Sequence, residues 1–119
     1  MAKKEINDHR NPRLKKEFYL HRTALRDYII NFGRSVPKEA KILDFGCGFK
    51  PYQQYFSTDN YYGVDVFEGS EANVICLVEI PFKENTFDYL FAFQVMEHVP
   101  NPREMVAEMQ RVLKPGGKL

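Results

Sequence analysis

The sequence has little cysteine, no tryptophan and no long apolar run. Its two cysteines, Cys47 and Cys76, are too few for a disulfide framework, and no Cys/His cluster has the spacing of metal ligands. No apolar stretch approaches the roughly 20 residues that span a membrane, and the opening MAKKEINDHR lacks the apolar core of a signal peptide. We therefore expect a protein of the reduced cytoplasm with neither a membrane span nor a bound metal.

The sequence also has no large excess of positive or negative charge: its net charge is only +1. The distribution is uneven: residues 1–40 hold ten Lys and Arg against five Asp and Glu, and residues 41–119 hold seven against eleven. The basic first part can attract an anionic substrate or surface, although a solvated helix face is the commoner case. The basic and aromatic residues do not interleave as in nucleic-acid-binding proteins, so we expect no nucleic acid partner.

The apolar residues that are present, 44% of 119, are enough for one globular domain. Asn11-Pro12 is a typical helix start, and apolar residues then recur at helical spacing (Leu14, Phe18, Leu25, Ile29 and Phe32) until Gly33 and Pro37. The pattern predicts an amphipathic helix over residues 12–32. We divide the chain into a basic helical segment, residues 1–40, and an α/β domain, residues 41–119.

The second part alternates strands with helices. Short apolar runs predict strands at residues 41–45, 61–66, 73–78 and 87–93, and helices are expected at 51–56 and 102–113. Strands that are almost wholly apolar are typical of a doubly wound, mostly parallel sheet covered on both faces. The link between the second and third strands has little helical signal.

The sequence stops two residues after Pro115-Gly116-Gly117, where a fifth strand is expected to begin. In a sheet that ends there, the fourth strand, residues 87–93, has one exposed edge. An exposed edge invites pairing with another chain. We therefore expect that such an edge allows a homodimer.

A glycine-rich turn follows the first strand in the stretch ILDFGCGFKPY, residues 42–52. Gly46 and Gly48 let the backbone turn sharply and approach a ligand closely. In open parallel sheets, ligands bind at the carboxyl ends of the strands, which is where this turn lies. Asp65 ends the second strand, 17 residues beyond Gly48, and an acid at that place binds ribose hydroxyls in dinucleotide folds.

Two residues near the turn argue against a bound pyrophosphate. Pro51 lacks the N–H that a phosphate uses at a helix start, and Asp44 adds a negative charge beside the turn. S-adenosylmethionine carries no phosphate, and its ammonium group suits a nearby carboxylate. The turn therefore favours S-adenosylmethionine over NAD.

The sequence resembles the class I S-adenosylmethionine-dependent methyltransferases of the type 11 kind over residues 40–119. The resemblance depends on ILDFGCG, YYGVDV and the ordered motifs Pro-Phe, Phe-Asp, Glu-His-Val and Leu-Lys-Pro-Gly-Gly in residues 80–119. It implies a Rossmann-like fold, here the N-terminal half of one with a leading helix. It also implies these cofactor contacts: Asp44, Gly46, Cys47 and Gly48 at the methionine end, Asp65 at the ribose, Val66 and Leu77 at the adenine, and Phe93 and Gln94 again at the methionine part.

The sequence departs from the family pattern in two places. Lys50 stands where many relatives have a third glycine, and residues 76–78 offer no acid for the adenine amino group. Glu97 and His98 follow the fourth strand on the rim of the expected site. His98 can accept a proton from a methyl acceptor, because imidazole is the side chain that commonly acts as a general base, or the pair can be structural.

Two functions remain open from the sequence. The first is transfer of a methyl group from S-adenosylmethionine to a small molecule, by this chain or by an enzyme of which it forms the cofactor half. The second is a catalytically silent domain that keeps the fold and pairs through its open sheet edge. The sequence does not identify the methyl acceptor.

Overall fold

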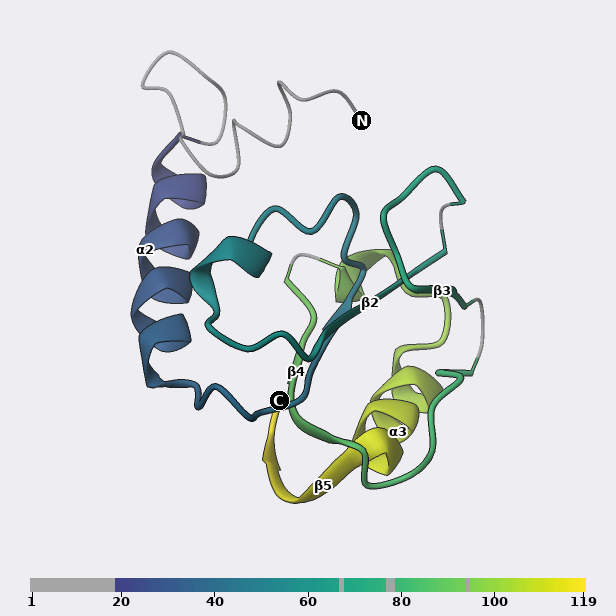
Figure 1. The fold of residues 1–119 in the computed structure, drawn as a ribbon. Helices are drawn as coiled ribbons and strands as arrows, with labels where there is room; N and C mark the ends of the chain where they lie inside the picture. The colour runs from purple at the N-terminus through teal and green to yellow at the C-terminus, as the bar shows by residue number, and fades with distance from the viewer. Residues whose placement is uncertain (1–18, 67, 77–78, 94) are drawn as a thin grey trace.

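The computed structural model describes residues 19–66, 68–76, 79–93 and 95–119, which form a sheet with a helix on each face (Figure 1). The sheet has the order β3-β2-β1-β4-β5, and every paired neighbour is parallel. The strands are β1 (Ile42–Phe45), β2 (Tyr61–Asp65), β3 (Val74–Ile75), β4 (Phe87–Phe91) and β5 (Leu113–Lys118). The α-helices are α2 (Tyr19–Ser35) and α3 (Pro102–Val112), and the 3₁₀ turns are η1 (Gln53–Tyr55) and η2 (Met96–His98). The predicted α/β fold with a mostly parallel sheet is confirmed.

The centre of the sheet is β1, whose four residues are all buried. Ile42 pairs with Tyr61 of β2 on one side and with Tyr89 of β4 on the other. A strand with neighbours on both edges and helices on both faces has no contact with water, which explains its apolar sequence. The one charged residue in this strand, Asp44, is therefore exceptional.

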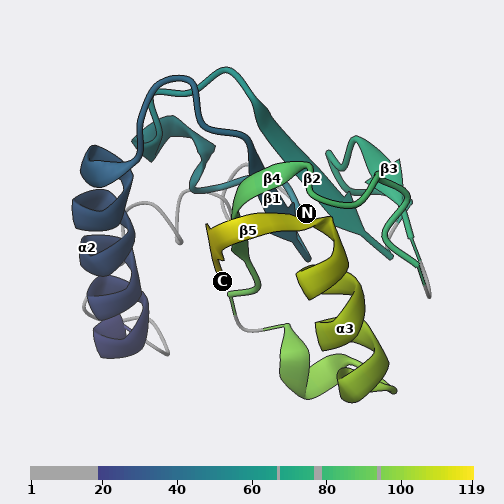
Figure 2. The ribbon, with the colours of Figure 1, turned by 90° about the horizontal axis from the view of Figure 1, so that it is seen from below.

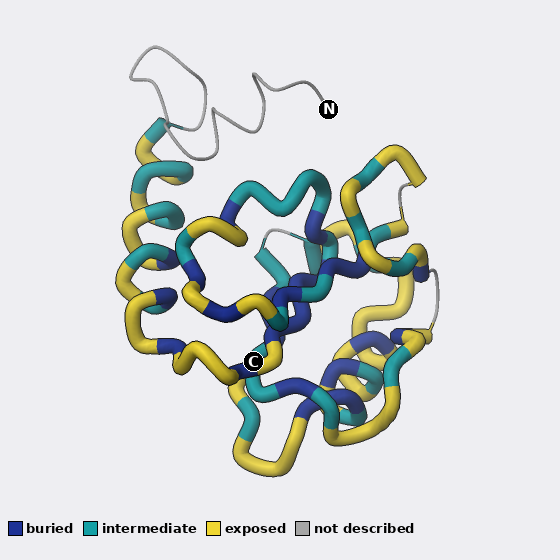
Figure 3. Tube along the Cα trace, in the orientation of Figure 1, coloured by how far each residue is buried: buried dark blue, intermediate teal, exposed yellow. Residues whose placement is uncertain are grey.

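Side chains of successive strand residues pack into two separate cores. The buried residues are concentrated along the central strands of the sheet (Figure 3). Leu43 and Phe45 face α3, whose buried residues are Met105, Met109 and Val112. Ile42 faces α2 and packs in a cluster with Ile29, Val36, Ala40, Tyr52, Phe56, Tyr61 and Phe91. The view along the sheet shows α2 and α3 on opposite faces (Figure 2). The prediction that the sheet is covered on both faces is confirmed.

The leading helix α2 extends further at its C-terminal end than the sequence predicted. Residues 12–18 of the predicted helix lie outside the described residues, and the apolar positions Ile29 and Phe32 do face the core. The prediction that the helix stops at residue 32 is wrong, because α2 includes Gly33 and ends at Ser35. Gly33 is packed so closely against the Tyr55 carbonyl that a Cβ at this position would collide with it. The glycine therefore serves packing and does not end the helix.

The fifth strand, which the sequence predicted to begin after Gly117, begins earlier in the structure. Helix α3 begins at Pro102 as expected, but it ends at Val112, and β5 starts at Leu113 with no loop between them. Strand β5 pairs with β4 between Phe87 and Tyr89, so the expectation that this whole edge is open is wrong. Leu113 is buried in the α3-side core, which brings the following residues against β4. Among the described residues, β5 is therefore the last strand of the sheet on this side, and its pairing with β4 extends from Phe87 to Tyr89.

The link between β2 and β3 has no helix among its described residues, 66 and 68–73, as the weak helical signal suggested. Asn73 anchors this link: its backbone N–H donates to the Gly63 carbonyl at 2.9 Å, and its side-chain oxygen accepts from the Gly63 N–H at 2.9 Å. Strand β3 has two residues where six were predicted. None of the described helices is long and apolar enough to cross a membrane.

Candidate functional site

The turn after β1 has a left-handed backbone at three positions. Gly46, Gly48 and Lys50 have φ angles of 72°, 53° and 52°. A Cβ at Gly46 would collide with the side chain of Val95, whereas a Cβ at Gly48 would meet no atom within 4 Å. Lys50 adopts the conformation that a third glycine would adopt, and its Nζ donates to the Asn73 side-chain oxygen at 2.6 Å. The sequence departs from the three-glycine pattern here, but the backbone does not.

Asp65, at the end of β2, holds the turn in place. The N–H of Gly48 donates to Asp65 Oδ2 at 2.8 Å, and the N–H of Val66 donates to Oδ1 at 2.7 Å. Sequence reasoning missed this contact with Gly48, since it assigned Asp65 only to a ligand. Asp65 therefore fixes the turn from the end of β2 and places a carboxylate at the carboxyl edge of the sheet.

Asp44 lies beneath the turn and is 4% exposed. The Tyr61 hydroxyl donates to Asp44 Oδ2 at 2.6 Å. Burial raises the pKa of Asp44 to about 7, although the hydrogen bond from Tyr61 and the charge of Lys50 act in the opposite direction. Burial, together with the nearby Asp44 carboxylate, also raises the pKa of Tyr61. Sequence reasoning did not single out Tyr61, and only its place on a strand beside Asp44 could have indicated it.

Cys47 is buried under the turn and points toward β2. A Cβ on Gly63 would lie 2.5 Å from the Cys47 sulfur, so the glycine leaves the space that the thiol fills. Burial, and then the negative charge of Asp44, raises the pKa of Cys47 to about 12. A thiol that stays neutral at ordinary pH is a poor nucleophile. Cys47 therefore shapes the turn and has no covalent chemistry.

A cavity of about 310 Å³ opens beside the turn. Gly46, Asp65, Val66 and His98 line it together, which brings four of the expected site residues to one place. Its other lining residues are apolar: Phe45, Val95, Val99, Pro100 and, from α3, Met105. Two polar side chains, Asp65 and His98, on an otherwise apolar wall are typical of sites for small organic ligands.

The His98 side chain is 80% exposed, and its Nε2 lies 3.9 Å from Glu97 Oε1. This distance is too long for a hydrogen bond that would orient the ring. His98 is thus on the rim of the cavity, and none of the described residues fixes its orientation. No group of three or more His, Cys, Asp or Glu side chains capable of holding a metal is found in the described part of the chain.

Other expected site residues do not line this cavity. Asp44, Cys47 and Gly48 are not among its lining residues, and Phe93 packs on the α2 side, stacked on Phe91 at 5.2 Å between ring centroids. Leu77 and Gln94 lie outside the described residues. The structure therefore gathers the residues expected at the ribose and adenine but separates Phe93 from them.

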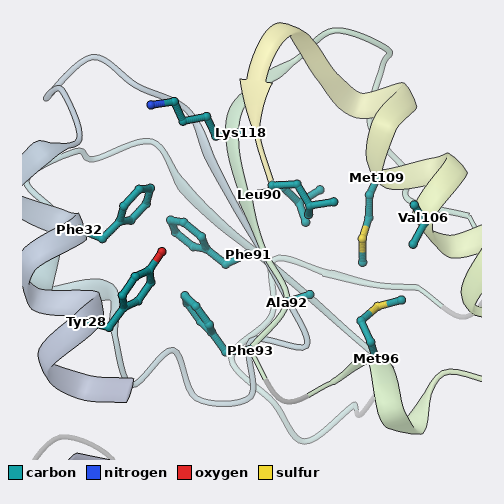
Figure 4. A pocket seen from close by; sticks show the side chains of 11 residues that line it. Tyr28, Phe32, Leu90, Phe91, Ala92, Phe93, Met96, Val106, Met109 and Lys118 are labelled. Carbon is teal, nitrogen blue, oxygen red and sulfur yellow. The ribbon is translucent and has the colours of Figure 1, made fainter. Parts of the chain in front are cut away.

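Phe93 lines a larger cavity of about 610 Å³, which we name the edge groove (Figure 4). Leu90 and Ala92 pack toward the α3 side of the sheet, and Phe91 and Phe93 pack toward the α2 side, yet all four line the groove. Neighbouring side chains of a strand point to opposite faces, so a cavity that all four share runs along the strand's edge. The remaining lining residues come from α2, η2, α3 and the chain's last two residues: Tyr28, Phe32, Met96, Val106, Met109, Lys118 and Leu119.

Comparison with known proteins finds a match to the methyltransferase domain family over residues 43–119. An uncharacterized protein of Methanocaldococcus jannaschii is 44% identical over 72% of this chain and 45% of its own length. The sterol 24-C-methyltransferase of Schizosaccharomyces pombe is 26% identical over 87% of this chain and 32% of its own length. The chain thus spans less than half the length of these relatives.

Solved structures share the fold at low sequence identity. A SAM-dependent methyltransferase from Aquifex aeolicus superposes with a TM-score of 0.62 and 22% identity, over 97% of this chain and 69% of that protein. The likeness to solved structures establishes the fold, and the match to the domain family over residues 43–119 establishes the family.

Proposed function

Because the chain belongs to the methyltransferase domain family, we propose that it binds S-adenosylmethionine and supports methyl transfer to a small molecule. The observation that carries the proposal is the cavity at the glycine turn, where Gly46, Asp65 and Val66 meet at the carboxyl ends of β1 and β2. This is the edge at which open parallel sheets bind their ligands.

The described residues fit this cofactor. The backbone at Gly48 is open to close approach, because a Cβ there would meet nothing within 4 Å. Asp65 lines the cavity at the end of β2, where an acid suits ribose hydroxyls, and the exposed Val66 offers an apolar surface to the adenine. Asp44, under the turn, suits the ammonium of the methionine part.

The cofactor supplies a methyl group on a sulfonium, which is reactive enough that alignment with the acceptor provides much of the acceleration. The role of the protein is then to bind the cofactor and the methyl acceptor and to orient them. His98, exposed on the rim of the cavity, is the candidate to accept a proton from the acceptor. The activity, acceptor and partners of the whole protein belong to this proposal, since the chain spans less than half of its relatives.

Calorimetric titration of S-adenosylmethionine against the wild type and Asp65→Ala tests the proposal. We expect binding by the wild type and a loss of at least about tenfold in affinity for Asp65→Ala, since a charged hydrogen-bond acceptor is removed. Asp59→Ala is the matched control, because Asp59 is an exposed acid in a turn outside the cavity. Folded wild type that binds no S-adenosylmethionine contradicts the proposal.

The edge groove favours a second candidate, a catalytically silent domain that pairs with another copy along β4. Three exposed apolar residues, Tyr28, Val106 and Leu119, line this one groove. Light scattering is expected to show a dimer for the wild type and a monomer for Val106→Glu, which places a charge in the groove. A strictly monomeric wild type removes this candidate.

A further inference from the structure

Asp44 is the one charged residue of the central strand, and the structure pairs it with a single donor. Among the described residues, only the Tyr61 hydroxyl donates a hydrogen bond to Asp44, to Oδ2 at 2.6 Å. No described donor reaches Oδ1. A buried carboxylate usually has several donors, because burial without them costs free energy. Asp44 is therefore held at one oxygen and keeps the other for a further partner.

The geometry of the strand pair explains why Tyr61 is the donor. Asp44 pairs directly with Gly63, which has no side chain, and the space over Gly63 is filled by Cys47 and by the stem of Lys50. Tyr61 lies two residues before Gly63, on the same face of β2, at the diagonal position. A diagonal neighbour on adjacent strands is within reach of a long aromatic side chain.

We propose that Tyr61 is a positioning residue of the cofactor site, which holds the Asp44 carboxylate ionised and turned so that its second oxygen receives the cofactor's ammonium. This inference deepens the proposed function and depends on it. Tyr61 does not touch the cofactor, and it acts through Asp44. Its ring packs in the α2-side core, so the hydroxyl is held in one place.

The proposal predicts a pH dependence of cofactor affinity. The ionisable groups around Asp44 are Tyr61 and Asp65 from β2, Cys47 and Lys50 from the turn, Tyr52 before η1 and, next to Tyr52, Arg22 of α2. The pKa of Asp44 is about 7, so its carboxylate, and with it the affinity, is lost as the pH falls through neutrality. Because the Tyr61 hydrogen bond favours the charged form, removing it moves this transition to higher pH.

The test measures the affinity of S-adenosylmethionine by calorimetry from pH 5.5 to 9 for wild type and Tyr61→Phe. If the pKa of Asp44 rises by about one unit, the variant binds roughly fivefold more weakly at pH 7. The two affinities should converge near pH 9, where Asp44 is ionised in both. The carbon-13 carboxyl resonance of Asp44, followed in the free protein, should titrate at higher pH in the variant.

Tyr62→Phe is the matched control, because Tyr62 is the next residue of β2 and packs on the other face against Phe82 and Phe87. It should reproduce the wild-type curve. A Tyr61→Phe variant that follows the wild-type affinity at every pH overturns the role of Tyr61 alone. A wild type that fails to bind S-adenosylmethionine overturns the proposed function as well. A loss of affinity that is equal at pH 7 and pH 9 indicates a merely structural role and also overturns the inference.

Discussion

The two glycines of the turn should respond very differently to the same substitution. Both have a left-handed backbone, which costs an L-residue about 1–2 kcal/mol. At Gly46 a Cβ would also collide with Val95, lying 2.8 Å from its Cγ1 and closer still to its Cγ2. Overpacking of this kind costs typically about 1–3 kcal/mol. We therefore expect Gly46→Ala to destabilise the fold by about 2–5 kcal/mol and Gly48→Ala by about 1–2 kcal/mol.

Urea denaturation followed by circular dichroism measures both free energies of unfolding. A double-mutant cycle with Val95→Ala separates most of the two contributions, since that background removes the two colliding methyl groups, leaves the Cβ of residue 95 at 3.1 Å and keeps the backbone strain. Gly46→Ala should then cost about as much as Gly48→Ala. Gly48→Ala should still weaken S-adenosylmethionine binding, because its methyl group enters the open space beside the turn. Equal costs for both glycines in the wild-type background would refute the reasoning.

Two further predictions concern stability. Burial raises the pKa of Asp44 to about 7 from 3.8, so the folded chain binds a proton that the unfolded chain releases, and stability should fall as the pH rises between about 4 and 7. Asp44→Asn should abolish that slope in thermal melts across this range; an unchanged slope would contradict it. Arg111→Met should cost about 2 kcal/mol in urea denaturation, because it removes hydrogen bonds to two backbone carbonyls and to Glu108 in a half-exposed site (Ile80 O, Phe82 O and the Glu108 carboxylate). The exposed Arg103→Met is its control and should stay within about 0.5 kcal/mol of wild type.

The opposite pH responses of stability and of proposed cofactor affinity follow from the same carboxylate. An ionised Asp44 destabilises the folded chain, and an ionised Asp44 is what a bound ammonium requires. Sites of this kind give up stability for function. In this chain Tyr61 reduces the loss of stability that an ionised Asp44 causes, because its hydrogen bond favours the ionised form.

The sequence was sufficient for features set by local patterns. Residues 42–45 of the predicted first strand are all buried, and Pro102 begins α3, because strand burial and a first-turn proline leave clear patterns. The predicted C-terminal end of α2 was wrong because Gly33 has a packing role that depends on Tyr55, 22 residues later. Strand β5 was predicted to begin too late, because its start depends on Leu113 entering the core. Neither contact is visible in a local window.

Several residues of the candidate site were predicted from the sequence, but the hydrogen bonds between them were not. Gly46, Asp65, Val66 and His98 do meet at one cavity. The left-handed backbone of Lys50 was not expected, because a lysine gives no sign of it in the sequence. The hydrogen bonds from Gly48 to Asp65 and from Tyr61 to Asp44 depend on strand register, which becomes known only once the sheet is formed.

Helix α3 forms a shared wall between the two cavities. Met105 lines the cavity at the glycine turn, and the next residue, Val106, lines the edge groove. The same helix passes into β5 at Leu113 without a loop, so it cannot tilt without moving the strand beside β4. A displacement of α3 would therefore change the walls of both cavities and the position of β5 together.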